Sequence, residues 1–347
     1  MQRNPHSYQI ATGYRTFYSL SLIYQPITKK TIVFPQKTTD LLYNVAIPSA
    51  SGYDSMLKNI GSVQNKGYEL SIESDNLSGA FSWTTAFNIS FNRNKVLELG
   101  GETYKDVGTY DDHLKTSDIR RLIVGQPIGV FYGYRFDGIF QNEAECAQQT
   151  SSPSPIGVGL RRYKDLNGDG KIDATNDREI LGDANPKFFG GMTNTFAYRG
   201  FELNVFLQYS YGNKIFNYNA MELESPTGGQ NVYQDLVNRW TPTNPSNEYQ
   251  KATTNRNNIV SDRFIEDGSF LKLKTVSLSY SFPKLNWKHL GGLRLYVTGQ
   301  NLLTWTKYRG YDPEVSYRGA STLEAGEDFG GYPQARTFMF GIKLDIK

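Results

Sequence analysis

The feature that most constrains the fold is a strict two-residue alternation of apolar and polar side chains, in segments of about ten residues. In one segment Phe81, Trp83, Thr85, Phe87, Ile89 and Phe91 alternate with Ser82, Thr84, Ala86, Asn88, Ser90 and Asn92. At the end of the chain Phe338, Phe340, Ile342, Leu344 and Ile346 alternate with Met339, Gly341, Lys343, Asp345 and Lys347. Because successive side chains of a strand point to opposite faces, each segment predicts a strand with one apolar and one polar face.

Two kinds of β-protein show this pattern. In a soluble sheet the polar face contacts bulk water, whereas in a membrane barrel the apolar face contacts lipid and the polar face a wet lumen. Aromatic residues make up 14% of the chain although its hydrophobic fraction is only 38%. This combination is typical of a membrane barrel with aromatic girdles, and also of a secreted β-sandwich that binds carbohydrate.

Nine long strands are expected from the pattern. We place them at Tyr8–Tyr24, Lys29–Leu42, Val63–Ser74, Gly79–Leu97, Phe188–Tyr198, Phe201–Tyr211, Ser269–Phe282, Leu293–Thr304 and Ala335–Ile346. In the strand from Ser269 the apolar positions change phase after Leu273, which predicts a β-bulge near Lys274.

The connections between these strands alternate in length. Short ones are predicted at Gln25–Thr28, Asp75–Ser78, Arg199–Gly200 and Pro283–Gly292, and long ones at Asn44–Ser62, Gly100–Lys187, Gly212–Gly268 and Trp305–Gln334. Short turns on one side and long loops on the other are how outer-membrane barrels are built, so we expect the strand-like run Ile128–Phe140 to lie in an extracellular excursion. An odd number of antiparallel strands cannot close into a ring. The count therefore predicts the C-terminal part of a larger barrel, of which Phe87, Ile89, Leu203, Val205, Leu278 and Phe340 would face lipid.

The most specific candidate site is a calcium-loop-like run of oxygen-bearing residues at alternate positions. Asp165, Asn167, Asp169, the carbonyl of Lys171 and Asp173 or Asp177 are the expected ligands. Gly170 would permit the sharp turn of such a loop. The alternative is a solvated turn without metal. We expect one structural Ca²⁺ here, outside any EF-hand, because no helical pattern flanks the run.

The sequence offers little chemistry beyond this loop. The single Cys146 excludes an intramolecular disulfide, and His6, His113 and His289 are too far apart in sequence to suggest zinc. No catalytic set is apparent, so no enzyme is expected, and a net charge of +3 gives no argument for nucleic acid. Trp240, Trp287 and Trp305 fit either an interfacial belt or the anchoring of loops. The polar start of the chain holds no signal peptide, so the chain is expected to be intracellular or not the start of its protein.

Several ordered blocks resemble the SusC/RagA family of TonB-linked outer-membrane proteins. They include LRLYVTGQNLLTWTKYRGYDPEV at Leu293–Val315, NIGSVQNKGYELSI at Asn59–Ile72, VGQPIGVFYGYRFDGIF at Val124–Phe140 and YKDLNGDGKID at Tyr163–Asp173. The resemblance covers residues 35–347, with the calcium-loop-like insertion at 163–177, whereas residues 1–34 match poorly and could form a strand pair.

The resemblance implies uptake of glycans or peptides across the bacterial outer membrane, with a SusD-like surface lipoprotein as partner and energy from TonB. It also implies that the plug and the TonB-contact segment lie in an N-terminal part that this chain lacks, so we expect no transport by the chain alone. Two alternatives stay open. One is the secreted, calcium-stabilised β-sandwich that binds carbohydrate, and the other is a remnant without independent activity.

Overall fold

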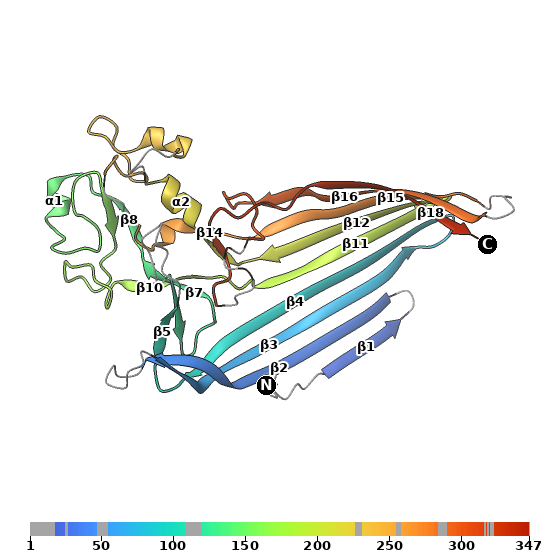
Figure 1. The fold of residues 1–347 in the computed structure, drawn as a ribbon, viewed down its shortest axis with the longest axis horizontal. Helices are drawn as coiled ribbons and strands as arrows, with labels where there is room; N and C mark the ends of the chain where they lie inside the picture. The colour runs from blue at the N-terminus through green and yellow to red at the C-terminus, as the bar shows by residue number, and fades with distance from the viewer. Residues whose placement is uncertain are drawn as a thin grey trace, which may run out of the picture.

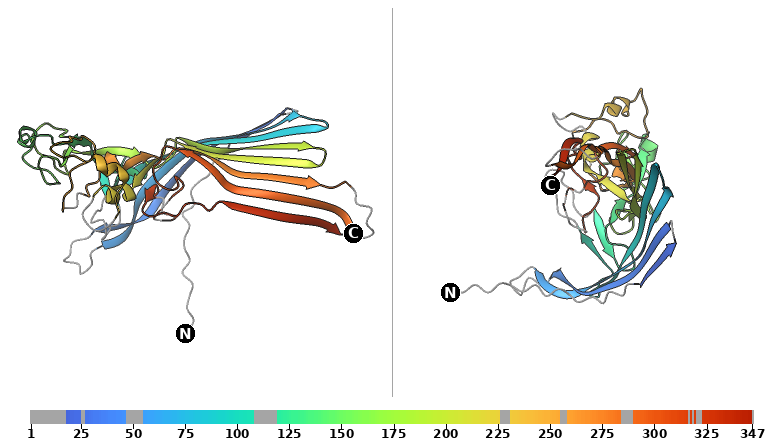
Figure 2. Two further views of the ribbon diagram at one scale, coloured as in Figure 1. Left: turned by 90° about the horizontal axis from the view of Figure 1, so that it is seen from above. Right: turned by 90° about the vertical axis from the view of Figure 1, so that its right-hand side faces the viewer.

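The computed structural model describes residues 18–24, 27–46, 55–107, 119–225, 231–254, 258–283, 290–315, 317, 319 and 323–346. Its main element is a nine-stranded antiparallel sheet that curves into a trough (Figures 1 and 2). The strands are β1 (Tyr18–Tyr24), β2 (Ile27–Ala46), β3 (Ser55–Leu77), β4 (Phe81–Leu99), β11 (Phe188–Tyr198), β12 (Phe201–Tyr211), β15 (Phe270–Ser281), β16 (Leu290–Thr306) and β18 (Thr337–Ile346). They lie in the sheet in chain order, so each long strand pairs with its neighbours in sequence.

All nine predicted strands are present, with shifted ends. The first begins at Tyr18 within the described residues, and the preceding part of its predicted range lies outside them. The connection predicted at Asn44–Ser62 was too long, because β2 continues to Ala46 and β3 begins at Ser55. The two strands pair through these ends, with Ala46 opposite Ser55, so the hairpin continues into residues that had been predicted as a loop.

The register places the six predicted lipid-facing residues on one face. Leu203 lies opposite Leu278, which lies opposite Val297, which in turn lies opposite Phe340. Phe87 lies opposite Met192 of β11, and Met192 lies opposite Leu207 of β12. Phe87 is therefore on the same face as Leu203 and Leu207. Directly opposed residues of an antiparallel pair project from the same side of the sheet, so the fold confirms the predicted phase of the alternation. Edge strand β18 displays this apolar face openly, and Phe340 is 82% exposed.

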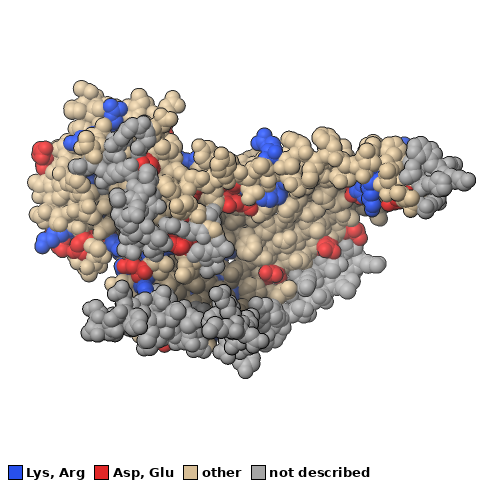
Figure 3. Space-filling view, in the orientation of Figure 1, with Lys and Arg blue, Asp and Glu red and all other residues tan. Residues whose placement is uncertain are grey.

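The other face is polar. Arg294 of β16 pairs with Glu202 of β12 at 2.6 Å and donates to Ser279 of β15. Figure 3 shows acidic and basic side chains scattered on the face of the sheet turned to the viewer. Gly341 interrupts this face in β18 because Tyr296 lies directly opposite, and a Cβ at Gly341 would come within 2.1 Å of the Tyr296 ring.

The predicted bulge near Lys274 is confirmed. Leu273 and Thr275 pair with consecutive residues of β12, so Lys274 is skipped in that ladder. The ladder with β16 shifts at the same point, where Asn301 adopts a positive φ of 53°. The extra residue explains why the apolar positions change phase here while the strand stays in the sheet.

At one end of the trough, the long connections fold together into a second region, which we call the loop body: the described parts of 100–187, 212–269 and 307–336 (Figure 2). It contains a sheet of β5 (Tyr104–Val107), β6 (Arg120–Ile123), β7 (Val130–Tyr134) and β10 (Arg178–Asp183). A second sheet joins β13 (Lys214–Asn217), β14 (Ile265–Asp267) and β17 (Glu327–Asp328), and a third joins β8 (Phe136–Ile139) and β9 (Arg161–Tyr163). Its helices are α1 (Glu143–Cys146), α2 (Tyr218–Leu223) and the 3₁₀ turns Gln234–Asn238 and Asp262–Phe264.

The largest buried cluster among the described residues lies in the loop body, and a smaller one joins the end of β4 to it through Val96, Leu99 and Leu122. Phe131 comes from the first connection, while Phe216, Met221 and Phe264 come from the second, and all four are fully buried in one cluster. Phe329 of the third connection packs against the same cluster. The run Ile128–Phe140 contributes β7 and β8 to these small sheets, so its placement outside the spanning strands is confirmed.

Candidate ligand-contact region

A buried ion network ties the three long connections of the loop body together. The Glu224 carboxylate, 0% exposed, contacts Arg161 at 3.9 Å, Arg263 at 2.7 Å and Arg309 at 3.2 Å. Arg120 of the first connection donates to Glu327 of the third at 2.9 Å, and both side chains are almost fully buried. Burial lowers the pKa of the Arg120 guanidinium, while Glu327 opposes that shift. Removing one member of such a network strands a buried charge, so the network favours a single arrangement of the loops.

A second charged group joins the loop body to the polar face of the sheet. Lys272 of β15, with its side chain 1% exposed, donates to Asp312 and to Glu314, each at 2.6 Å. We call these three residues the lysine–carboxylate cluster. Gln208 of β12 also donates to Glu314 at 2.8 Å, and the backbone N–H of Gln334 donates to Asp312 at 3.1 Å. The cluster fixes the 307–336 connection against the inner wall of the trough.

The electrostatics of this cluster follow from burial and pairing. Burial raises the pKa of the Asp312 and Glu314 carboxyls, but the hydrogen bond from Lys272 and further donors outweigh it, so each pKa lies below its ordinary value. Both acids therefore stay ionised at neutral pH. No role was predicted for either acid from the sequence, although both stand in the YDPE run within Leu293–Val315.

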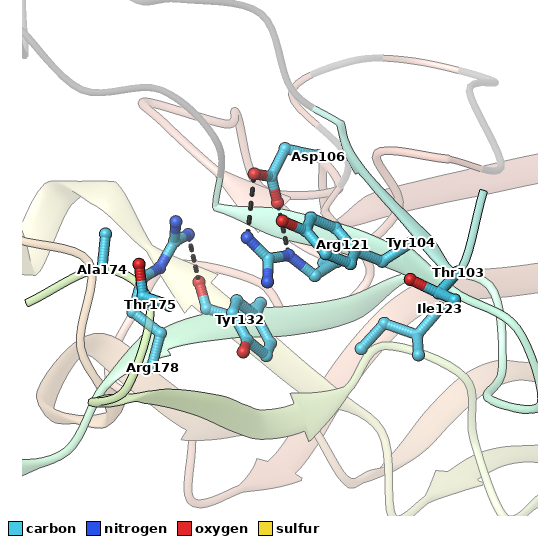
Figure 4. Close-up of a pocket in the computed structure, with 9 residues that line it drawn as sticks. All are labelled: Thr103, Tyr104, Asp106, Arg121, Ile123, Tyr132, Ala174, Thr175 and Arg178. Atoms are coloured by element: carbon cyan, nitrogen blue, oxygen red, sulfur yellow. Dashed lines mark hydrogen bonds and ion pairs between the residues drawn. The ribbon is translucent and has the colours of Figure 1, made fainter.

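The loop body also holds a cavity of about 560 Å³ between its four-stranded sheet and the segment 174–175 (Figure 4). Its lining consists of Thr103, Tyr104, Asp106, Arg121, Ile123, Tyr132, Ala174, Thr175 and Arg178. Arg121 lies between two aromatic rings, 3.9 Å from the centre of Tyr104 and 4.0 Å from that of Tyr132. It donates from Nε and Nη2 to the two carboxylate oxygens of Asp106 at 2.6 and 2.9 Å.

The second arginine of the cavity also lies beside Tyr132. Arg178 of β10 donates to the carbonyl of Tyr132 at 3.2 Å, and its guanidinium lies 5.1 Å from the centre of the Tyr132 ring (Figure 4). The two arginines and the two tyrosines that contact them come from four different strands, β5, β6, β7 and β10. No local motif marks them in the sequence, because the pairing of four short strands is what brings them together.

The predicted calcium ligands lie in one compact turn. Asp165 accepts from the backbone N–H groups of Gly168 and Gly170, and Gly170 has a positive φ of 77°. Buried Asp177 closes the turn by accepting from the N–H groups of Leu166 and Asp173.

The carboxylates of this turn are held by local donors. Asp169 accepts from the N–H of Lys171 and from the side chain of Asn167, and Asp173 accepts from the N–H of Asn176. The N–H of Gly170 is the main cause that lowers the pKa of Asp165, and that of Asn176 is the main cause for Asp173. Among the residues that the structure describes, no three side chains of His, Cys, Asp or Glu converge on a metal position.

The structure distinguishes the two interpretations of the tryptophans, an interfacial belt or the anchoring of loops. Trp240 is buried and donates to Gln141 at 3.1 Å, so it anchors a loop and the belt interpretation was wrong for it. Trp305 is half exposed at the end of β16, on the apolar face opposite Leu271, as the belt interpretation requires. Trp287, His6, His113 and His289 lie outside the described residues. Within the described part of the chain, no helix is long and apolar enough to cross a membrane.

Comparison with known proteins gives extended matches. The chain is 40% identical over 317 residues to TonB-dependent receptor P3 of Formosa agariphila, a match that covers 89% of this chain and 31% of the receptor. It is 28% identical over 321 residues to TonB-dependent receptor SusC of Bacteroides thetaiotaomicron, covering 90% of this chain and 29% of SusC. No family model matches.

The fold has solved counterparts. A chain of the RagAB peptide transporter superposes with a TM-score of 0.73 at 23% identity, covering 92% of this chain and 33% of that one. The RagAB peptide importer in its open-open state gives a TM-score of 0.72. The chain thus spans about a third of the length of the relatives it matches, which are receptors and transporters of the bacterial outer membrane. By sequence, the chain is a relative of the TonB-dependent receptors of the bacterial outer membrane, SusC among them, over the third of their length that it matches.

Proposed function

We propose that the chain forms a barrel wall and an external ligand-contact region of a TonB-dependent importer of glycans or peptides. The observation that carries this proposal is the division of the molecule into two parts. A nine-stranded sheet has one apolar and one polar face, and the long connections form a packed, charged body at one end of it. This is the arrangement of a membrane barrel whose long loops meet solutes outside the cell.

The energy source and partner in this proposal follow from the family. The described sheet ends in two edge strands, β1 and β18. An open edge in lipid leaves backbone N–H and C=O groups unpaired at several kcal/mol each, so we propose that further strands of the transporter pair with both. TonB would act on a part of the transporter outside the third that this chain matches. A SusD-like surface lipoprotein would cover the loop body and deliver substrate, and the chain itself would catalyse no reaction.

A gain-of-function experiment tests this assignment. The chain is exported to the outer membrane alone, or joined in frame to the remaining two-thirds of a family member. Uptake of labelled oligosaccharides and peptides is then measured with and without TonB. We expect TonB-dependent uptake from the joined protein, increased by co-expressed lipoprotein, and none from the chain alone. Energy-dependent uptake by the chain alone would contradict the proposed pairing with further strands.

We further propose that the turn from Asp165 to Asp177 binds one structural Ca²⁺. The positive φ of Gly170 and the donation of its N–H to Asp165 give the tight curl that such loops require. Each carboxylate oxygen has a second lone pair, so the hydrogen bonds within the turn leave capacity for a metal. Asp165, Asn167, Asp169, the carbonyl of Lys171 and Asp173 or Asp177 would be the ligands.

Calcium removal gives a direct test. With the affinity of extracellular modules, 10 mM Ca²⁺ should add about 1–3 kcal/mol to the stability of the folded protein. Thermal unfolding with EDTA should therefore begin at a lower temperature than unfolding with calcium. Asp169→Asn should weaken this response, whereas Asp137→Asn, in the same connection but outside the turn, should preserve it. Equal melting temperatures with calcium and with EDTA would show that the turn holds no metal.

A further inference from the structure

Four basic side chains gather on the apolar face of the large sheet, where β2, β3 and β4 approach the loop body (Figure 1). Lys66 of β3 lies opposite Arg93 of β4. Two positions further along β3, Gln64 lies opposite both Lys37 of β2 and Lys95 of β4. All four basic side chains are exposed. We call Lys37, Lys66, Arg93 and Lys95 the basic patch.

The basic patch directly borders the apolar surface of the sheet. Phe91 projects on the same side as Phe87, because the two residues are four positions apart in one strand. Tyr68 lies opposite Phe91, and the centres of their rings are 5.4 Å apart. Lys66 and Arg93 are the next residues on this face, so positive charge begins where the aromatic surface ends.

A pocket of about 460 Å³ spans this border. Its lining consists of Val33, Phe34, Pro35, Lys66, Gly67, Tyr68, Phe91 and Arg93. The pocket thus combines a mainly apolar wall with two cations. A soluble anion would use only the cations, whereas a lipid could place an acyl chain against the aromatic rings and its headgroup beside Lys66 and Arg93.

The charge of the basic patch calls for a polyanionic headgroup. Arg93 donates to the main-chain carbonyls of Asn92 and Lys187, each at 2.9 Å, and these carbonyls hold the guanidinium without cancelling its charge. The ion pairs found among the described residues include no member of the basic patch. The patch extends over three strands, about 10 Å across, and about 7 Å along them. Four cations over this area match a headgroup with two phosphates better than a single phosphodiester.

We propose that the basic patch and its pocket bind an outer-leaflet lipid that carries two phosphate groups. Lys66, Arg93 and the lysines beside Gln64 would contact the phosphates, and an acyl chain would lie along Tyr68 and Phe91. Basic clusters at a membrane surface attract anionic lipids, and basic pockets bind their headgroups. The inference rests on the proposed function, which places the apolar face in lipid and the loop body outside the cell.

Equilibrium binding to the chain within the assembled transporter, purified in detergent, tests this site. The probes are lipid A with both phosphates, the same lipid with its phosphates removed, and the deacylated sugar diphosphate headgroup. We expect the intact lipid to bind at least tenfold more tightly than either of the others. Lys66→Gln combined with Arg93→Gln should weaken its binding at least tenfold. Lys66→Arg combined with Arg93→Lys keeps both charges and should weaken it less than threefold.

Arg199→Gln combined with Lys343→Gln is the matched control. It removes the same charge from two exposed residues at the opposite end of the sheet, one in the turn between β11 and β12 and the other opposite Arg294. This control should bind lipid A as the unchanged protein does.

Three outcomes would overturn the inference. They are equal binding of lipid A with and without phosphates, equal loss of binding in the control pair, and equally tight binding of the deacylated headgroup. Failure of the proposed membrane placement would instead appear as reversed lipid exposure of spin labels at Phe87 and Asn88, a readout that does not involve the basic patch.

Discussion

At the scale of single residues, Lys272 holds the lysine–carboxylate cluster together. It is buried between Asp312 and Glu314, whereas its neighbour Lys274 contacts Glu314 at 3.0 Å from a position that is 26% exposed. Lys272→Met leaves two carboxylates without their main partner and should cost about 3–5 kcal/mol, because breaking a buried pair strands a charge. Lys274→Met should cost at most about 1 kcal/mol.

Limited proteolysis in detergent, together with thermal unfolding, distinguishes these two variants. Release of the 307–336 connection should make it sensitive to protease in Lys272→Met and leave it protected in Lys274→Met. Equal protection in both variants would mean that the lysine–carboxylate cluster does not hold this connection.

The same cluster should make stability depend on pH. The pKa of Asp312 and of Glu314 is lower in the folded protein than its ordinary value of about 4. The folded state thus binds these protons less readily than the unfolded state. The cluster stabilises the protein at pH values above 4, and this stabilisation disappears as the pH falls through the lower folded values. Melting temperatures between pH 7 and pH 3 should fall less steeply in Lys272→Met, and an unchanged slope would contradict the assignment.

Residues of this kind could not be predicted from the sequence. The alternation tells which face a side chain occupies, but not which loop returns to that face. Asp312 and Lys272 are forty positions apart, and their contact depends on how the last long connection folds. For the same reason, the sequence did not indicate that Arg121 and Arg178 lie together. The Asp165–Asp177 run could be recognised as a candidate calcium loop because its residues are close in sequence.

At the scale of elements, the alternating strands were predictable and the loop body was not. Long strands of period two, separated by short turns, gave the order, the faces and even the bulge at Lys274. The strands of the loop body are only a few residues long, such as Arg161–Tyr163 and Glu327–Asp328. A segment that short has no measurable period, so its pairing follows from the buried core around Phe216 and Phe264.

The strands make a depth-dependent prediction. Phe87 lies on the apolar face of β4, and Asn88 on its polar face. Phe87→Arg should destabilise the assembled barrel by about 2–4 kcal/mol if the position lies near the bilayer midplane, while Asn88→Arg should have little effect. Urea-dependent unfolding in lipid vesicles measures both. A larger penalty at Asn88 would reverse the assignment of the two faces.

At the scale of the whole molecule, the curved sheet is a barrel wall with its apolar face in lipid. The position of the largest buried cluster supports this, since that cluster lies in the loop body while the sheet leaves large apolar side chains such as Phe340 and Ile342 exposed. In a soluble sandwich a second layer would cover such a face. The two-part design also explains how a chain of low hydrophobicity belongs in a membrane, because only alternate residues of its strands contact lipid.

The most direct test of this claim is site-directed spin labelling of the chain within an assembled transporter in lipid vesicles. Labels at Phe87 and Leu203 are compared with labels at Asn88 and Asn204, using oxygen as a lipid-soluble relaxation agent and a nickel chelate as a water-soluble one. We predict that the first pair responds mainly to oxygen and the second mainly to the nickel chelate. The reverse pattern, or a water-soluble response at all four positions, would contradict the assignment of the sheet to the membrane.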